Sequence, residues 1–129
     1  MRMRRVYSLL LAGLLPAAGF AQDCPAGTVY LTFDTGSMIS AELIAQTLRE
    51  ENVKATFFLA NEKTFRGDYS LDPSWDSYWK QLAREGHRFG NHTWSHPNME
   101  EIGVDAYLAD IQRNEAILAE LTGDPTGAS

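Results

Sequence analysis

The 129-residue sequence has a single cysteine, no internal repeat and no low-complexity linker. Its 11 basic side chains are outnumbered by 17 acidic ones, which argues against nucleic acid or another polyanion as a partner. With 44% hydrophobic and 22% charged residues, the chain is neither a disordered acidic tail nor a multi-span membrane protein. Its length allows one domain at most.

Residues 1–21 have the three-part layout of a secretory signal peptide. Three arginines precede an uncharged, leucine-rich stretch, Val6 to Phe20, which is shorter than the ~20 apolar residues of a spanning helix. Gly19 and Ala21 are small enough for a signal-peptidase site, so we expect cleavage after Ala21. The protein would then be periplasmic or extracellular and not a membrane protein. A retained membrane anchor is the alternative.

The mature chain, residues 22–129, would carry 8 basic and 17 acidic side chains, a net charge of −9. This balance again indicates no nucleic-acid partner. Cys24 lies three residues after the predicted cut. In an oxidising compartment, one leftover thiol implies either a partner outside this chain or a free thiol.

Strand-like and helix-like patterns alternate along the mature chain. β-Branched and aromatic residues predict strands at 28–33, 54–60 and 87–91. The second of these is a nearly continuous apolar run, typical of a strand buried on both faces. Helices are predicted from the cap Ser40 to about Asn52, from the cap Ser74 to Gly86, and over 104–121, with loops at 61–73 and 92–103.

This β-α-β-α-β-α order predicts an α/β fold with a parallel sheet, whose strands carry the chemistry at their carboxyl ends. Asp34 follows the first strand, Asn61 the second, and His92 and His96 the third. Two imidazoles four residues apart can both direct a nitrogen at one divalent cation. The alternative is that they cap the loop or hydrogen-bond within a turn.

Asp34 also has two interpretations. It could act as a general base at the mouth of a site, or it could form an Asx turn where the chain leaves the strand. The residues alone do not separate these roles.

Aromatic residues are concentrated near the second helix. The spacing of Trp75, Tyr78 and Trp79 favours core packing over stacking on sugar rings. Trp94, between the two histidines, could line a glycan groove or wedge the loop against the fold. His87 begins the third strand, so we expect it at the opposite end from the site, with a structural or surface role.

Three blocks in this order and spacing resemble the NodB-homology polysaccharide deacetylases: YLTFDTG at 30–36, KATFFL at 54–59 and GHRFGNHTWSH at 86–96. The resemblance runs from about Thr28 to Pro125. It implies a deformed (β/α) barrel that removes N- or O-acetyl groups from an acetylated polysaccharide or oligosaccharide. It also implies a divalent metal, Zn²⁺ foremost with Co²⁺ or Ni²⁺ possible, with His92 and His96 as its ligands and Asp34 as the catalytic base.

The sequence departs from the family pattern at Thr35. The family has a second aspartate at this place, which serves as a metal ligand. A neutral hydroxyl is a poorer ligand than a carboxylate, so we expect weak metal binding or none. Asp34 could swing in as a third ligand, or an acid of the long loop, Asp68 or Asp72, could substitute.

The second departure is length. The chain holds about three β-α units of the barrel, and the family's later blocks, including the one with its general-acid histidine, are missing. We therefore expect residues 22–129 to be the N-terminal part of a deacetylase domain, with the last strand edge unpaired. This makes activity of the chain by itself doubtful. The alternatives are a catalytically inactive glycan-binding or structural domain, or a non-functional gene fragment.

Overall fold

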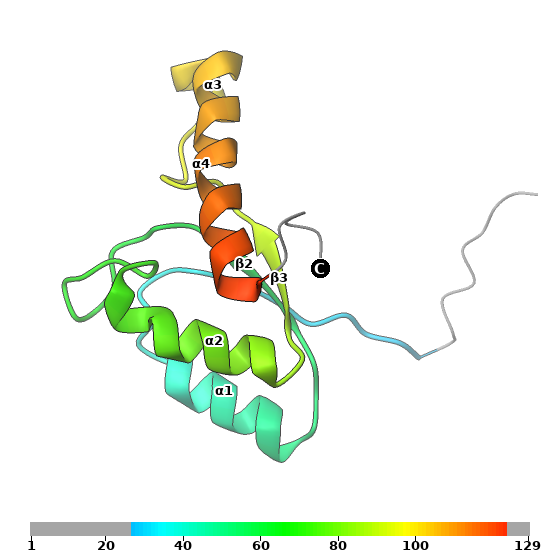
Figure 1. The fold of residues 1–129 in the computed structure, drawn as a ribbon. Coiled ribbons are helices and arrows are strands. Elements are labelled where there is room, and N and C mark those ends of the chain that lie inside the picture. The colour runs from blue at the N-terminus through cyan, green and yellow to red at the C-terminus, as the bar shows by residue number, and fades with distance from the viewer. Residues whose placement is uncertain (1–26, 124–129) are drawn as a thin grey trace, which may run out of the picture.

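The computed structural model describes residues 27–123 and shows one parallel sheet with helices packed on it (Figure 1). Its strands β1 (Thr32–Asp34), β2 (Thr56–Leu59) and β3 (Arg88–Asn91) lie in the order β1-β2-β3. The helices are α1 (Ala41–Glu50), η1 (Pro73–Trp75, a 3₁₀ turn), α2 (Asp76–Arg84), α3 (Met99–Ile102) and α4 (Val104–Thr122). The α/β prediction is confirmed. The predicted signal peptide and Cys24 lie outside the described residues.

The core lies between the sheet and the helices. Phe33, Phe57 and Phe89 occupy matching positions on the three strands, and their rings stack in sequence with centroids 5.3 and 6.1 Å apart. Helices α1, α2 and α4 close this layer with buried residues such as Leu48, Trp79 and Leu118. The core role predicted for the aromatics of the second helix is confirmed, because Trp75, Tyr78 and Trp79 are all buried.

Only one face of β2 is fully buried, so the prediction of burial on both faces is wrong. Phe57 and Leu59 point into the core, whereas Phe58 on the other face is half-buried. The Phe58 ring lies against Gly90 of β3, and a Cβ at that position would come within 2.5 Å of it. A glycine is therefore required there if Phe58 keeps this position.

Several local predictions need correction. The first strand begins only at Thr32, and Val29 and Tyr30 before it are exposed. Ser74 does not cap a helix, because its hydroxyl donates to Asp68 Oδ2 at 2.8 Å and α2 begins two residues later. The predicted loop at 92–103 contains the short helix α3.

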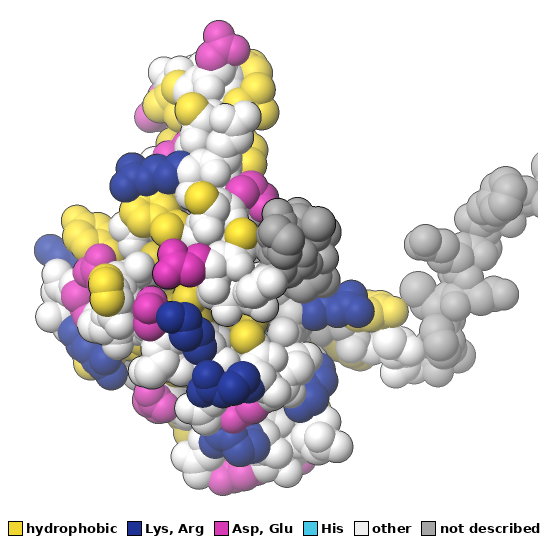
Figure 2. Space-filling model, in the orientation of Figure 1, with side chains coloured by type: hydrophobic (Ala, Val, Ile, Leu, Met, Phe, Trp, Pro, Cys, Tyr) yellow, Lys and Arg dark blue, Asp and Glu magenta, His cyan; other side chains and the backbone are white. Residues whose placement is uncertain are grey.

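The apolar residues of α4 are spaced along one face of the helix, which predicts burial of that whole face, but only its C-terminal half is buried. Leu118 and Leu121 are buried, while Val104 and Leu108 are exposed. Figure 1 shows α3 and the start of α4 extending beyond the sheet, and hydrophobic side chains lie on this end in Figure 2.

The edges of the sheet remain open within residues 27–123, where β1 and β3 each pair only with β2. This agrees with the prediction that the last strand has an unpaired edge. No helix in the same range has the length and apolar character needed to cross a bilayer.

Candidate functional site

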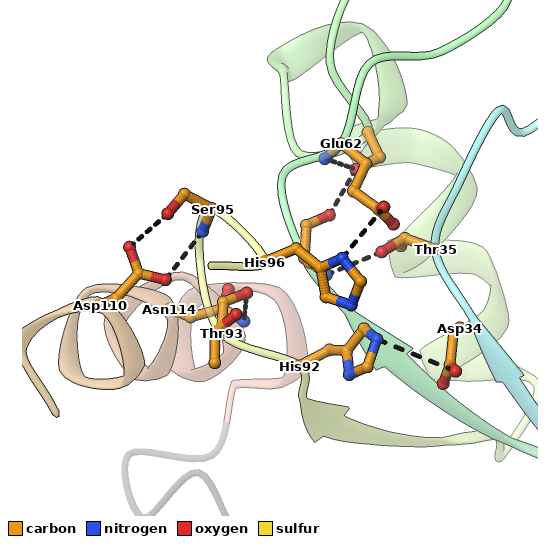
Figure 3. Close-up of polar contacts among 11 residues, drawn as sticks. Asp34, Thr35, Glu62, His92, Thr93, Ser95, His96, Asp110 and Asn114 are labelled. Carbon is orange, nitrogen blue, oxygen red and sulfur yellow. Dashed lines mark hydrogen bonds and ion pairs between the residues drawn. The ribbon is translucent and has the colours of Figure 1, made fainter. Parts of the chain in front are cut away.

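Polar side chains meet where the three parallel strands end (Figure 3). We call this group the carboxyl rim and define it as Asp34, Thr35, Glu62, His92 and His96. Asp34 is the last residue of β1, Glu62 follows β2, and His92 follows β3. Because parallel strands place their carboxyl ends at one edge, residues far apart in the sequence come together here.

The two histidines share one loop, residues 92–98, which we call the histidine loop. Their ring centroids are 4.5 Å apart, with the planes tilted by 41°. The loop turns sharply, since Thr93 and His96 have φ angles of 65° and 52°. Left-handed backbone is unfavourable for a β-branched residue such as threonine, so other contacts must hold the loop.

Each histidine has a carboxylate beside it. His92 Nε2 lies 3.8 Å from Asp34 Oδ2, and His96 Nδ1 lies 3.7 Å from Glu62 Oε1. Both separations exceed hydrogen-bond length. Asp34 is the more accessible acid, with 60% of its side chain exposed against 27% for Glu62. The sequence prediction named Asp34 but not Glu62, because a loop acid carries no periodic signal.

Thr35 is buried and its hydroxyl has a structural partner. The backbone N–H of Ala60 donates to Thr35 Oγ1 at 2.8 Å, and the Thr35 N–H donates to Phe58 O at 3.0 Å. Both bonds join the end of β1 to the end of β2. The hydroxyl at this position therefore helps to fix the strand ends.

Neither Asp68 nor Asp72 substitutes for the missing acid in this structure. Asp68 accepts hydrogen bonds from Thr64, Ser74 and Trp75, and these bonds lower the pKa of its carboxyl. Asp72 Oδ2 accepts the N–H of Tyr69 at 2.8 Å. Both acids thus stabilise the loop before α2.

The histidine loop is held by α4. Asn114, fully buried, directs its Nδ2 at Leu59 O, Thr93 O and Asn91 Oδ1, at 2.5, 2.9 and 3.1 Å. Asp110 accepts both the N–H and the hydroxyl of Ser95, at 2.8 and 2.9 Å. Figure 3 shows these contacts on the side of the loop away from Asp34. The sequence prediction missed both residues, since they lie within a helix.

Trp94 is partly covered, because the Arg113 guanidinium lies 3.9 Å from the centre of its ring. Its carbonyl accepts the N–H of Asn61 at 2.7 Å, which ties the histidine loop to the end of β2. Asn61, expected at the rim, uses its side-chain oxygen to accept the N–H of Leu71. Trp94 is thus wedged against the fold on one face.

Two depressions adjoin the rim. One, of about 330 Å³, is lined by residues that include His92, His96, Pro97 and Tyr107. The other, of about 220 Å³, is lined by residues that include Asp34, Met38, Ile44 and Trp79. A ligand at the rim could therefore extend along the histidine loop or from Asp34 towards α1.

The residues of the rim fit a divalent cation in chemical kind. Two imidazoles and two carboxylates are donors that zinc or a similar ion accepts. Glu62 Oε2 is also buried and has no hydrogen-bond partner in the described part of the chain, so this oxygen has no other contact to give up. Across residues 27–123, no three such donors converge closely enough to form a preassembled metal site.

His87 lies at the other end of the sheet, as predicted, and is buried. Its Nδ1 accepts the N–H of Ala55 at 3.2 Å, and its ring lies edge-on to Phe57. Burial lowers the pKa of His87, and the positive charge of Lys54 acts in the same direction. This histidine is structural.

Several known proteins with similar sequences are deacetylases. A 96-residue segment is 40% identical to a peptidoglycan-N-acetylglucosamine deacetylase of Bacillus cereus, covering 74% of this chain and 32% of that protein. A chitin deacetylase of Pestalotiopsis is 28% identical, covering 92% of this chain and 42% of the other. The chain thus spans less than half the length of these relatives.

Solved structures give the same result. The Bc1960 peptidoglycan N-acetylglucosamine deacetylase matches with a TM-score of 0.59 and 38% identity, over 73% of this chain and 41% of the other. A family 4 acetyl xylan esterase from Clostridium thermocellum, solved with a cobalt ion, matches with a TM-score of 0.60 and 26% identity, over 73% of this chain and 43% of that one. These matches confirm the expected barrel type, of which this chain forms a part.

The polysaccharide deacetylase family model matches residues 21–128, nearly the whole predicted mature chain. The match covers all three sequence blocks and every residue of the carboxyl rim. The chain therefore belongs to the polysaccharide deacetylase family.

Proposed function

We propose that this chain forms the N-terminal part of a secreted, metal-dependent hydrolase that removes N- or O-acetyl groups from a glycan. The observation that carries the proposal is the meeting of Asp34, His92 and His96 at the carboxyl ends of β1 and β3. The named relatives act on peptidoglycan and chitin, which supports an acetylated glycan as the substrate class. The predicted signal peptide, residues 1–21, supports a periplasmic or extracellular location.

His92 and His96 would hold the cation, and the cobalt ion in the Clostridium thermocellum esterase supports a first-row metal. Zn²⁺ is our first choice, with Co²⁺ or Ni²⁺ as alternatives. When bound, such an ion supplies Lewis acidity that polarises the acetyl carbonyl and lowers the pKa of water.

Asp34 would act as the general base. Its carboxylate is solvent-accessible and lies 3.8 Å from His92, so it can reach a water molecule at the histidines. In hydrolysis, the water oxygen bonds to the acetyl carbon while Asp34 accepts the proton, and the amide or ester bond then breaks. The family resemblance assigns protonation of the leaving group to a histidine in a block that lies outside these 129 residues.

One observation favours a second candidate, an inactive glycan-binding domain. The residue at the position of the metal-binding acid is Thr35, and its hydroxyl already accepts the N–H of Ala60. A domain that had lost its metal could keep the fold and the depressions beside the rim. Glycan affinity would then be unchanged in a His92→Ala, His96→Ala double variant.

Acetate release tests the leading proposal. The full chain, and a hybrid in which it replaces the matching segment of the Bacillus cereus deacetylase, would be assayed with Zn²⁺, Co²⁺ or Ni²⁺. The substrates are chitooligosaccharide, acetylated xylan and peptidoglycan. We expect the hybrid to release acetate and Asp34→Asn to abolish this release, while Asp76→Asn on α2 leaves it unchanged. A folded hybrid that is inactive with every metal and substrate would contradict the proposal.

A further inference from the structure

Glu62 lies at the carboxyl rim on a firmly held piece of backbone. Its N–H donates to Ser70 Oγ and to Ala60 O, both at 3.0 Å, and its carbonyl accepts the Ser70 N–H at 2.9 Å. Ser70 is itself fully buried and donates its hydroxyl to Ala60 O. The position of the Glu62 side chain therefore follows from the end of β2 and not from a free loop.

The Glu62 carboxylate faces the site and has no hydrogen-bond partner among the residues that the structure describes. Its Oε1 lies 3.7 Å from His96 Nδ1, and its Oε2 is buried and unpartnered. Burying an ionised oxygen without a partner is unfavourable, so native structures usually supply a proton, a donor or a metal at such a place. Figure 3 shows Glu62 and Thr35 on the same side of the His96 ring.

The separation of the two side chains is informative. At 3.7 Å, Oε1 and Nδ1 are too far apart for a hydrogen bond. Two ligand atoms that each lie about 2.1 Å from a tetrahedral zinc ion are about 3.4 Å apart. The Glu62–His96 pair therefore needs only a small adjustment to share one ion.

The charge of the ligand set also favours Glu62 as a ligand. With Thr35 in place of an acid, the two histidines would bind a dication with no carboxylate unless a neighbour supplies one. Asp34 can do so only at the expense of its role as base, whereas the Glu62 carboxylate has no hydrogen bond to give up within residues 27–123. The two carboxylates lie at similar distances from the rim histidines, with Glu62 3.7 Å from His96 and Asp34 3.8 Å from His92.

We propose that Glu62 is the carboxylate ligand of this site and takes the place of the acid that Thr35 lacks. The inference rests on the proposed metal-dependent function and deepens it. In the competing role, Glu62 does not touch the ion but accepts a hydrogen bond from a ring N–H of His96 and so orients that ring.

Metal affinity of the purified full chain tests the inference without any assay of activity. Zn²⁺ affinity would be measured by competition with a chelating dye, and Co²⁺ coordination by visible absorption. The variants are Glu62→Gln, Thr35→Asp and their combination. Glu120→Gln, which removes an equal charge from an exposed position on α4, is the matched control. Circular dichroism and thermal melting would check that each variant folds.

We expect Glu62→Gln to weaken Zn²⁺ binding by roughly 100-fold, at the upper end of the loss seen for outer-shell changes, and to alter the Co²⁺ spectrum. Thr35→Asp should restore affinity in the Glu62→Gln background and add less in the parent, because both acids serve one coordination position. Glu120→Gln should bind like the parent.

Two outcomes would overturn the inference in different ways. If the parent binds Zn²⁺ and Glu62→Gln binds as tightly, or loses affinity with its Co²⁺ spectrum unchanged, Glu62 is not a ligand but the proposed function stands. If neither the parent nor Thr35→Asp binds any metal while both fold, the inference and the metal-dependent function fail together.

Discussion

Histidines lie at both ends of the three-stranded sheet, and their surroundings differ. At the amino end, His87 is buried, stacks edge-on to Phe57 and accepts one backbone N–H. At the carboxyl end, His92 and His96 are 30% and 53% exposed and stand beside carboxylates. The same side chain is a packing element at one end and a candidate ligand at the other.

The difference arises from the backbone that adjoins each end of β3. The amino end of β3 follows the tight turn at Gly86, so His87 is enclosed by the core at once. The carboxyl end of β3 leads into the histidine loop, which no strand follows in the described residues, and its side chains stay accessible. Residue type alone therefore does not predict a ligand; exposure and neighbouring acids separate the two uses.

The largest expected effect is a loss of stability on truncating Trp79, whose side chain lies in the core between the two ends of the sheet. Trp79 is 2% exposed, contacts Phe57 and Phe89, and donates its indole N–H to Ser70 O at 2.7 Å. Trp79→Ala should lower the free energy of unfolding by about 3–5 kcal/mol, as expected for a large buried aromatic. Urea denaturation would measure it.

Trp79→Phe is the matched control for this change. It keeps an aromatic ring but removes the indole N–H, so the free energy of unfolding should fall less than in Trp79→Ala. Equal losses in the two variants would show that the hydrogen bond to Ser70, and not packing, dominates at this position.

The second prediction compares how the histidines at the two ends of the sheet affect Zn²⁺ affinity and stability. The His92→Ala, His96→Ala double variant should lose Zn²⁺ affinity by at least about 100-fold with little change in stability, because both side chains are accessible. His87→Ala should do the reverse, weakening the fold while leaving metal affinity intact. A dye-competition assay and urea denaturation on the same samples would reveal both, and a loss of Zn²⁺ binding in His87→Ala would refute the contrast.

The third effect tests whether α4 holds the histidine loop. Asn114→Ala would remove the buried amide that donates to Leu59 O and Thr93 O, so Thr93 O would lose this donor, while Leu59 O would keep the N–H of His92. We expect a loss of about 1–3 kcal/mol in the free energy of unfolding and weaker Zn²⁺ binding, since Thr93 would no longer be held at its left-handed φ. Gln112→Ala, at an exposed position on the same helix, should change neither. Unchanged Zn²⁺ affinity in a destabilised Asn114→Ala would limit the residue to a structural role.

The sequence predicts the order of strands and helices well because that order depends on local patterns. It also places His87 correctly, since strand position fixes which end of the sheet a residue occupies. Glu62 could not be found this way. Its place depends on Ser70, eight residues later, and on the antiparallel bridge between Lys63 and Tyr69, and these contacts leave no periodic trace.

Other misses have the same cause. Ser74 has the residue type of a helix cap, yet its hydroxyl donates to Asp68 in the preceding loop. Asn114 and Asp110 lie within a helical pattern, and that pattern does not predict their contacts with the histidine loop. The exposed start of α4 follows a regular apolar pattern, but the described residues provide nothing that covers Val104 or Leu108.

The smallest expected effect is a pH dependence at the amino end of the sheet. Burial lowers the pKa of His87 below its ordinary value of 6.5, and Lys54 and Arg49 add to this while Glu85 opposes it. The Ala55 N–H donating to Nδ1 also favours the neutral ring. The unfolded chain therefore binds more protons than the folded chain between the lowered pKa and 6.5. Stability should be fully present above pH 6.5 and fall as the pH drops through that window.

Urea denaturation between pH 7.5 and pH 5 would measure this slope in the parent and in His87→Gln, with His92→Gln as the control. We expect His87→Gln to flatten the slope and His92→Gln to retain it, because the buried ring of His87 is the one whose pKa folding lowers. If His92→Gln flattened the slope instead, acid sensitivity would belong to the carboxyl rim, and the division between a structural and a ligand end would be reversed.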